Sequence, residues 1–127
     1  MNKTQSVNLQ EYYLYNKKCN LLLKEPEIRF AGFLDLMGNL IAGEFKEGVT
    51  PLHDESESRK LYIMAVLRVK SEEDFDYDLG EVEYSVSRRK RVITYTFCLG
   101  DKVLFVSTEP MTDIEKTAQK IIKISNV

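Results

Sequence analysis

The sequence predicts an α+β domain with a five-stranded antiparallel sheet and the element order α-β-β-α-β-β-β-α. Three segments begin with residue pairs typical of helix starts, and the stretches between them alternate apolar runs with short turn sequences. Short hairpin turns join antiparallel strands, and only one connection within the sheet is long enough to contain a helix. These observations favour a single sheet covered by helices.

Each predicted helix begins with a capping box, in which a polar side chain and an acidic residue three positions later satisfy free backbone amides. The pairs are Asn8 with Glu11, Asp54 with Glu57, and Thr112 with Glu115. The first helix is expected over about residues 8–24, and the second from residue 54 to about residue 69. In the third, four apolar residues recur at helical spacing: Ile114, Ala118, Ile121 and Ile122.

Five strands are expected between these helices. Residues 28–34 and 40–45 flank a tight turn at 35–39, which contains the glycine and asparagine that tolerate positive φ. Residues 82–86 alternate apolar with polar side chains, and residues 91–99 are apolar or β-branched almost throughout, as expected of a central strand. The last strand, residues 103–107, follows the two-residue turn Gly100-Asp101.

Length and composition indicate one ordinary globular domain over residues 1–127. Hydrophobic residues make up 43% of the chain and charged residues 30%, with a formal charge of −2, which argues against binding nucleic acid through the overall field. The segment from Met1 to Ser6 lacks the apolar core of a signal peptide, so a cytoplasmic location is expected. Cys19 and Cys98 match no metal-binding spacing, and both are expected in the core.

The stretch IRFAGFLDLMGNLIAG, residues 28–43, resembles the first hairpin of a roadblock domain, a fold related to the profilin-like and longin domains. The chain also resembles a small uncharacterised archaeal family through this hairpin and through GVTPL at 48–52, GEVEYS at 80–85 and VSTEP at 106–110. The resemblance implies a roadblock/profilin-like fold without enzymatic activity. It further implies homodimers or heterodimers that scaffold complexes or regulate small GTPases, usually by pairing their third strands and packing their second helices. No GTPase-contacting motif carries over to this sequence.

A dimer interface is therefore expected on the second helix and the third strand. Residues 61–67 are apolar on every side of a helix, so the side away from the sheet needs a second cover. The residues predicted to form the interface are Tyr62, Met64, Val66, Val82, Tyr84 and Val86. If a two-fold axis passes at Tyr84, Val82 of one copy lies opposite Val86 of the other. The alternative is that the first helix or the loop at residues 46–52 covers the second helix.

The turn between the third and fourth strands is strongly basic. It contains the four consecutive cations Arg88, Arg89, Lys90 and Arg91. This tip could bind phosphate, anionic lipid or an acidic partner surface, or it could simply be a soluble turn that discourages edge association. Nucleic acid is the less expected ligand, because no aromatic stacking platform or helix-turn-helix pattern accompanies the tip.

No catalytic, cofactor-binding or metal-binding site is predicted. The aspartates of residues 74–78 resemble the start of a calcium loop, but Leu79 and Ser85 stand where that loop needs glycine and glutamate. A solvated acidic loop is expected there instead. His53, the single histidine, has no serine or cysteine nucleophile motif beside it in the sequence.

The sequence thus favours a non-catalytic, homodimeric scaffold or regulatory domain that binds a further protein, in a complex linked to a small GTPase. The alternative function is a small-ligand sensor of the profilin-like or PAS-like kind. An apolar cavity of ligand size between sheet and helix would favour the sensor, whereas a filled core and an apolar helix surface would favour the scaffold.

Overall fold

The computed structural model describes residues 8–126, so the segment Met1–Ser6 and the ends of the predicted domain lie outside the described residues. The elements are α1 (Leu9–Leu22), β1 (Ile28–Asp35), β2 (Leu40–Phe45), α2 (Glu55–Glu72), the 3₁₀ turn η2 (Glu73–Phe75), α3 (Asp76–Leu79), β3 (Ser85–Arg88), β4 (Ile93–Leu99), β5 (Lys102–Thr108) and α4 (Ile114–Ser125). The predicted α+β fold and its element order are confirmed, with the short η2 and α3 added after the second helix.

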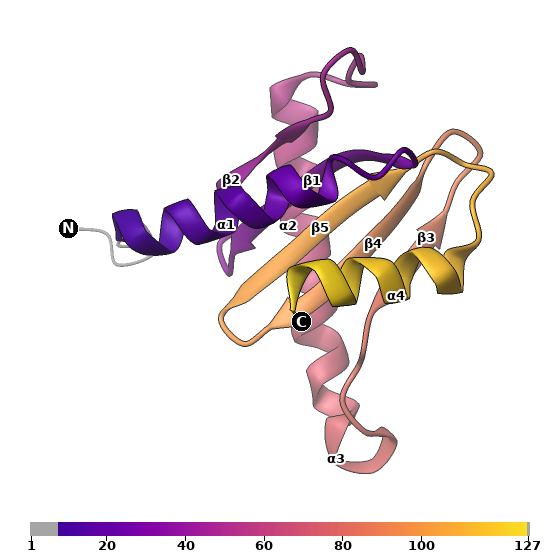
Figure 1. Cartoon of the computed structure of the whole chain (residues 1–127). Helices are drawn as coiled ribbons and strands as arrows, with labels where there is room; N and C mark the ends of the chain where they lie inside the picture. Colours follow the sequence, from indigo (N-terminus) through magenta and orange to yellow (C-terminus); the bar gives the residue numbers. More distant parts are fainter. Residues whose placement is uncertain (1–7, 127) are drawn as a thin grey trace.

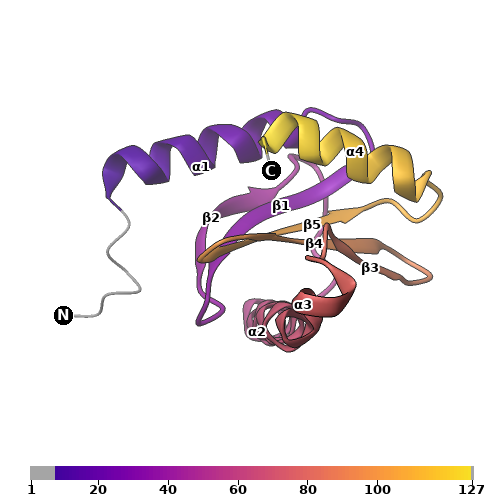
Figure 2. The same ribbon diagram turned by 90° about the horizontal axis from the view of Figure 1, so that it is seen from below.

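The five strands form one sheet in the order β2-β1-β5-β4-β3, and every neighbouring pair is antiparallel. The middle strand is β5, while β4 lies beside it and β3 forms an edge. Helices α1 and α4 cover one face of the sheet, and α2 crosses the other face (Figures 1 and 2). The molecule therefore has three layers, and side chains that alternate along a strand enter two different cores.

The larger core lies between the sheet and the pair α1 and α4. Its members are fully buried: Cys19, Leu22, Ile28, Ala31, Phe33, Ile93, Tyr95, Phe97, Leu104, Val106, Ala118 and Ile121. The smaller core lies between the sheet and α2, and consists of Phe30, Leu34, Ala65, Val66, Val69, Val103 and Phe105. Phe30 stacks its ring on Tyr62, at 5.9 Å between centroids, so aromatic contacts fix the start of α2 against the sheet.

The β1–β2 hairpin is as tight as its sequence predicts. The carboxylate of Asp35 accepts hydrogen bonds from the backbone amides of Met37 and Asn39, at 2.8 and 3.0 Å. Gly38 supplies the positive φ of +83° that the turn requires. The turn also packs on α2, because a Cβ atom at Gly38 would lie 2.7 Å from Cγ1 of Ile63.

Two local predictions are wrong, each for an identifiable reason. The last helix is capped by Asp113, whose carboxylate accepts from the Lys116 amide at 2.9 Å, while the Thr112 hydroxyl bonds back to the Glu109 carbonyl. Residues 74–78 are largely exposed, as expected, but they belong to the short helical turns η2 and α3 and do not form a loop. The side-chain caps at Asn8 and Asp54 are confirmed.

Candidate interaction surface

Helix α2 has two apolar sides. The inner side carries Ala65, Val66 and Val69 into the smaller core. Val66 is only 3% exposed, so its side chain contributes to the core and is absent from the outer surface where the sequence placed it. Tyr62, also predicted for the interface, is half-buried between the two sides, and burial raises the pKa of its phenol.

The outer side of α2 remains uncovered within residues 8–126. Ile63 and Met64 lie four and three positions before Leu67, so all three share one side of the helix, and they are 37%, 56% and 59% exposed. The exposed Leu36 and Met37 belong to the β1–β2 turn that packs against Ile63. We call these five residues the outer apolar surface. Helix α1 lies on the opposite face of the sheet (Figure 2), so the alternative in which α1 covers this surface is wrong.

The edge strand β3 lies beside α2 and pairs only with β4 among the described strands. Ser85 and Ser87 face α2, where their hydroxyls bond to Glu72 at 2.9 Å and to Arg68 at 3.1 Å. Val86 and Tyr84 instead pack toward the larger core. Val82 is 40% exposed and precedes the strand, because β3 begins only at Ser85.

The hydroxyl of Tyr84 ties the start of β3 to α4. It donates a hydrogen bond to the Glu115 carboxylate. This bond, together with slight desolvation, raises the pKa of Tyr84 to about 12, and it lowers the pKa of Glu115. Tyr84 therefore helps to fix the edge strand, while its ring lies 5.9 Å from that of Phe97.

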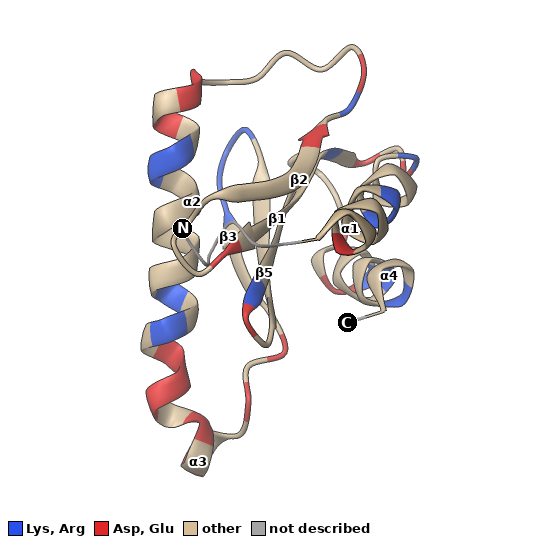
Figure 3. Cartoon of the chain, turned by 90° about the vertical axis from the view of Figure 1, so that its left-hand side faces the viewer, with Lys and Arg blue, Asp and Glu red and all other residues tan. Residues whose placement is uncertain are grey.

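The basic tip, residues Arg88 to Arg91, joins β3 to β4. The Arg89 amide donates to the Val92 carbonyl at 2.9 Å and closes the turn, so β4 begins at Ile93 rather than at the predicted residue 91. All four cationic residues are exposed, and none forms a salt bridge within residues 8–126. Figure 3 shows the tip as a blue loop at the opposite end of the sheet from the acidic end of α2.

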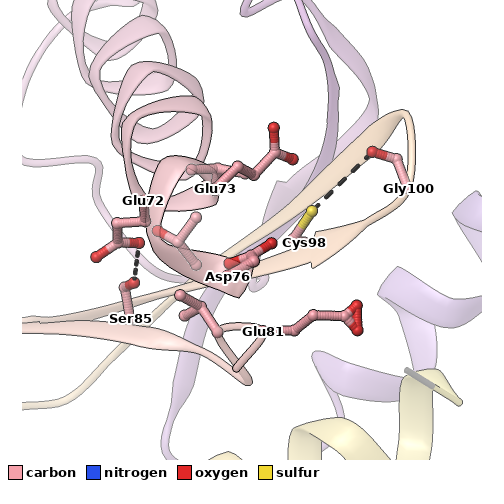
Figure 4. A pocket seen from close by; sticks show the side chains of 10 residues that line it. Glu72, Glu73, Asp76, Glu81, Ser85, Cys98 and Gly100 are labelled. Carbon is pink, nitrogen blue, oxygen red and sulfur yellow. Dashed lines mark hydrogen bonds between the residues drawn. The ribbon is translucent and has the colours of Figure 1, made fainter. Parts of the chain in front are cut away.

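A cleft of about 300 Å³ lies between the C-terminal end of α2, α3 and the strands β3 and β4 (Figure 4). Its lining contains four carboxylates and no Lys or Arg side chain. The acidic residues are Glu72, Glu73, Asp76 and Glu81, and the others are Val69, Val82, Ser85, Thr96, Cys98 and Gly100. The accumulated negative charge attracts cations and repels anions. We call it the acidic cleft.

Cys98 lies in this cleft and is exposed, so its predicted place in the core is wrong. It follows Phe97 on β4 and therefore points to the α2 face, at a place that α2 does not cover. Cys19 is buried as predicted, and burial, assisted by the charge of Glu44, raises the pKa of its thiol to about 12.

A second hollow, of about 60 Å³, lies beside the start of α2. Here Ser58 Oγ lies 3.1 Å from His53 Nδ1, a pair that the sequence analysis missed because the cap of α2 brings together residues five positions apart. Ser58 is 8% exposed. The hollow is much smaller than the roughly 300–1,000 Å³ typical of ligand pockets, so it gives the sensor alternative no support.

Two further findings concern the part of the chain that the structure describes. No group of three or more His, Cys, Asp or Glu side chains there is arranged to hold a metal ion. None of the helices there combines the length and apolar character needed to cross a membrane.

The Family of unknown function (DUF6659) matches residues 4–126 of the sequence. The chain belongs to this family. No curated protein matches this DUF6659 member.

Solved structures resemble the DUF6659 chain in fold. A roadblock/LC7 domain from Streptomyces avermitilis aligns with a TM-score of 0.68 and 11% identity over 87% of this chain and 91% of that one. Myxococcus xanthus MglB aligns with a TM-score of 0.72 and 18% identity, over 94% of this chain and 88% of that one. The gliding protein mglB from Thermus thermophilus aligns with a TM-score of 0.72 and 14% identity, over 99% of this chain and 98% of that one. The predicted roadblock fold is thus confirmed.

Proposed function

We propose that this DUF6659 chain is a non-catalytic protein-interaction module that forms a homodimer and acts as a scaffold or regulator in a larger complex. The observation that carries the proposal is the outer apolar surface on α2, which lies beside the unpaired edge of β3. The resemblance to roadblock domains is what supports a link between this complex and a small GTPase.

The outer apolar surface supports a partner on physical grounds. Met64 and Leu67 are each more than half exposed, although a surface helix needs only one apolar stripe. Burying such side chains stabilises an association by about 25 cal/mol per Å² of apolar area. Met64 is unbranched and adapts its shape to a partner, which suits a contact formed between two copies.

The edge of β3 supports a second contact in the same dimer. A second β3 strand could pair with it antiparallel, extending the sheet through backbone hydrogen bonds. Tyr84, where the sequence analysis placed a two-fold axis, precedes the strand. We therefore propose an axis at Val86, with Ser85 of one copy opposite Ser87 of the other. This centre lies within Ser85–Arg88 and keeps the paired side chains on matching faces.

Substitution of Met64 tests the dimer. The parent protein is expected to be a dimer in multi-angle light scattering, and Met64→Glu a folded monomer, because an unpaired carboxylate is strongly disfavoured in an apolar interface. The dissociation constant should rise at least about tenfold, which corresponds to about 1.4 kcal/mol.

Met111→Glu is the matched control. Met111 is 89% exposed and lies in the segment before α4, the helix that covers the other face of the sheet from α2, so this variant should dimerise like the parent. A parent that stays monomeric at high concentration, or a Met64→Glu variant that dimerises like Met111→Glu, would contradict the proposed function.

A further inference from the structure

A small hollow lies between helix α2 and the basic tip. Its volume is about 30 Å³, and it is lined by Leu61, Met64, Ala65, Arg68, Ser87, Arg89, Thr94, Thr96 and Phe105. Two arginines from different elements thus border one space, Arg68 from α2 and Arg89 from the tip, which is the blue loop in Figure 3. We call this space the arginine hollow.

The arginine hollow carries positive charge that nothing in the described chain neutralises. Within residues 8–126, neither Arg68 nor Arg89 forms a salt bridge, and no Asp or Glu side chain lines the hollow. Arg88, Lys90 and Arg91 adjoin Arg89 in the tip and strengthen the positive potential there. The complementary ligand is therefore an anion.

Hydroxyl groups lie on the strand side of the hollow. Ser87 of β3 is directly opposite Thr94 of β4, so both side chains lie on the face that α2 crosses. Thr96, two residues further along β4, shares that face. The Arg68 guanidinium donates from Nη1 to Ser87 Oγ at 3.1 Å, which uses one of its five N–H donors. The other donors and the hydroxyls can bond to the oxygens of an anion.

The size and the apolar wall of the hollow indicate which anion fits. Ligand pockets typically measure roughly 300–1,000 Å³, so this hollow holds only the end of a side chain. Leu61, Met64 and Phe105 form an apolar wall against which the methylene groups of a glutamate can pack. Its carboxylate can then bond to a guanidinium through both oxygens. A projecting side chain enters such a space between a helix and a loop, whereas the flat surface of a bilayer would contact the tip alone.

We propose that the arginine hollow binds a glutamate side chain from an acidic segment of a further protein. Arg68 and Arg89 bond to its carboxylate, and the other cations of the tip face neighbouring acidic residues of the same segment. Such complementary charge gives specificity and speeds the encounter of the two proteins. The inference rests on the proposed interaction module and names the chemistry of its further partner. It does not require the homodimer.

A short acidic peptide tests the inference. The probe is a fluorescein-labelled octapeptide of alternating glutamate and alanine, and its matched counterpart has glutamine at each glutamate. In fluorescence polarisation the glutamate peptide should bind at least about tenfold more tightly than the glutamine peptide. Arg68→Gln combined with Arg89→Gln should weaken its binding at least about tenfold. Arg68→Lys combined with Arg89→Lys should weaken it about threefold, because lysine keeps the charge but not the planar fork.

The control combines Lys17→Gln and Lys116→Gln, which make the same change in net charge at exposed positions on α1 and α4. It should bind the glutamate peptide like the parent. No binding of that peptide, an equal loss in this control, or unchanged binding by the lysine variant would overturn the inference. So would displacement of the peptide by an equal concentration of inorganic phosphate, or binding to phosphatidylserine vesicles in place of the peptide.

Light scattering on the same variants separates this inference from the homodimer. Arg68→Gln combined with Arg89→Gln should keep the oligomeric state of the parent, and circular dichroism should show that it is folded. A loss of the dimer in this variant would mean that a second copy supplies the carboxylate, which contradicts the inference. A monomeric parent that binds the glutamate peptide would overturn the homodimer and support the arginine hollow as a separate site.

Discussion

The burial of a single residue depends on which face of the sheet its side chain points to and on whether a helix covers that face. Cys19 and Cys98 both have apolar neighbours in the sequence, yet one is fully buried against the sheet and the other lines the acidic cleft. Local composition indicates that a residue is in an apolar segment. It does not show whether a helix covers the face to which that residue points.

The two thiols should therefore react differently. In the native protein a disulfide reagent should label one thiol, that of Cys98, because Cys19 is inaccessible and its pKa of about 12 leaves almost no thiolate at a mildly alkaline pH. Both thiols should react in denaturant, and Cys98→Ser should remove the native reaction. Rapid native labelling in Cys98→Ser would show that Cys19 is exposed.

At the scale of the elements, the pairing of β1 with β2 brings the two backbones unusually close together at Gly43. Gly43 has φ of +152° and pairs with Gly32 of β1. A Cβ atom at Gly43 would lie 2.4 Å from the Gly32 Cα and 2.5 Å from the Ala31 carbonyl oxygen. Backbone atoms cannot move aside as a flexible side chain can, so this position requires glycine.

Gly43→Ala should consequently reduce the free energy of unfolding by about 2–4 kcal/mol in urea titrations, the sum of overpacking and backbone strain. Gly48→Ala is the comparison, because Gly48 also has positive φ, +87°, but no atom lies within 4 Å of its added Cβ. Its cost should be only about 1–2 kcal/mol. Equal losses for the two variants would show that the close approach is not what requires glycine at residue 43.

A second inter-element contact joins α4 to the start of β1. Lys120 Nζ lies 3.1 Å from the Glu25 carboxylate and 2.8 Å from that of Glu27. Burial opposes the charge on Glu27, but the hydrogen bond from Lys120 outweighs it, so the pKa of Glu27 lies below its ordinary value of 4.5.

Lys120→Met should lower stability at neutral pH by about 0.5–1 kcal/mol, the range of a partly exposed ion pair. A lowered carboxyl pKa stabilises the folded state above the unfolded pKa, and that stabilisation is lost as pH falls through the folded pKa. The difference between parent and variant should thus shrink below pH 4.5, the ordinary value for Glu27. A difference that stays constant from neutral pH to well below that value would mean that packing, rather than charge, accounts for it.

Elements whose signals are local were predictable from the sequence, and those set by distant contacts were not. The caps at Asn8 and Asp54 and the turn at Asp35 depend on residues within four positions. The turns η2 and α3, by contrast, lie between α2 and β3 in the chain. The end of α2 is held to β3 by the hydrogen bond from Ser85 to Glu72, a contact between residues 13 positions apart. Periodicity likewise marked residues 61–67 as apolar without showing that Val66 faces the sheet.

At the scale of the whole molecule, the arrangement of faces determines which surfaces remain for partners. Both α1 and α4 occupy one face, which leaves α2 alone on the other with the β3 edge, the basic tip and the acidic cleft around it (Figures 2 and 3). The sequence predicted the order of elements along the chain. The order of strands across the sheet results from long-range pairing, which short sequence patterns do not encode.

That strand order has a consequence for how the chain is made. The middle of the sheet joins the first strand to the last, since Ile28 pairs with Thr108 and Asp35 with Lys102. On the ribosome, β1 is synthesised long before β5 exists, so its apolar side chains have neither their central neighbour nor the α4 layer during most of translation. Unpaired apolar strands of this kind aggregate readily. A nascent chain of this protein is therefore expected to depend most on chaperone binding before residue 108 has emerged from the ribosome.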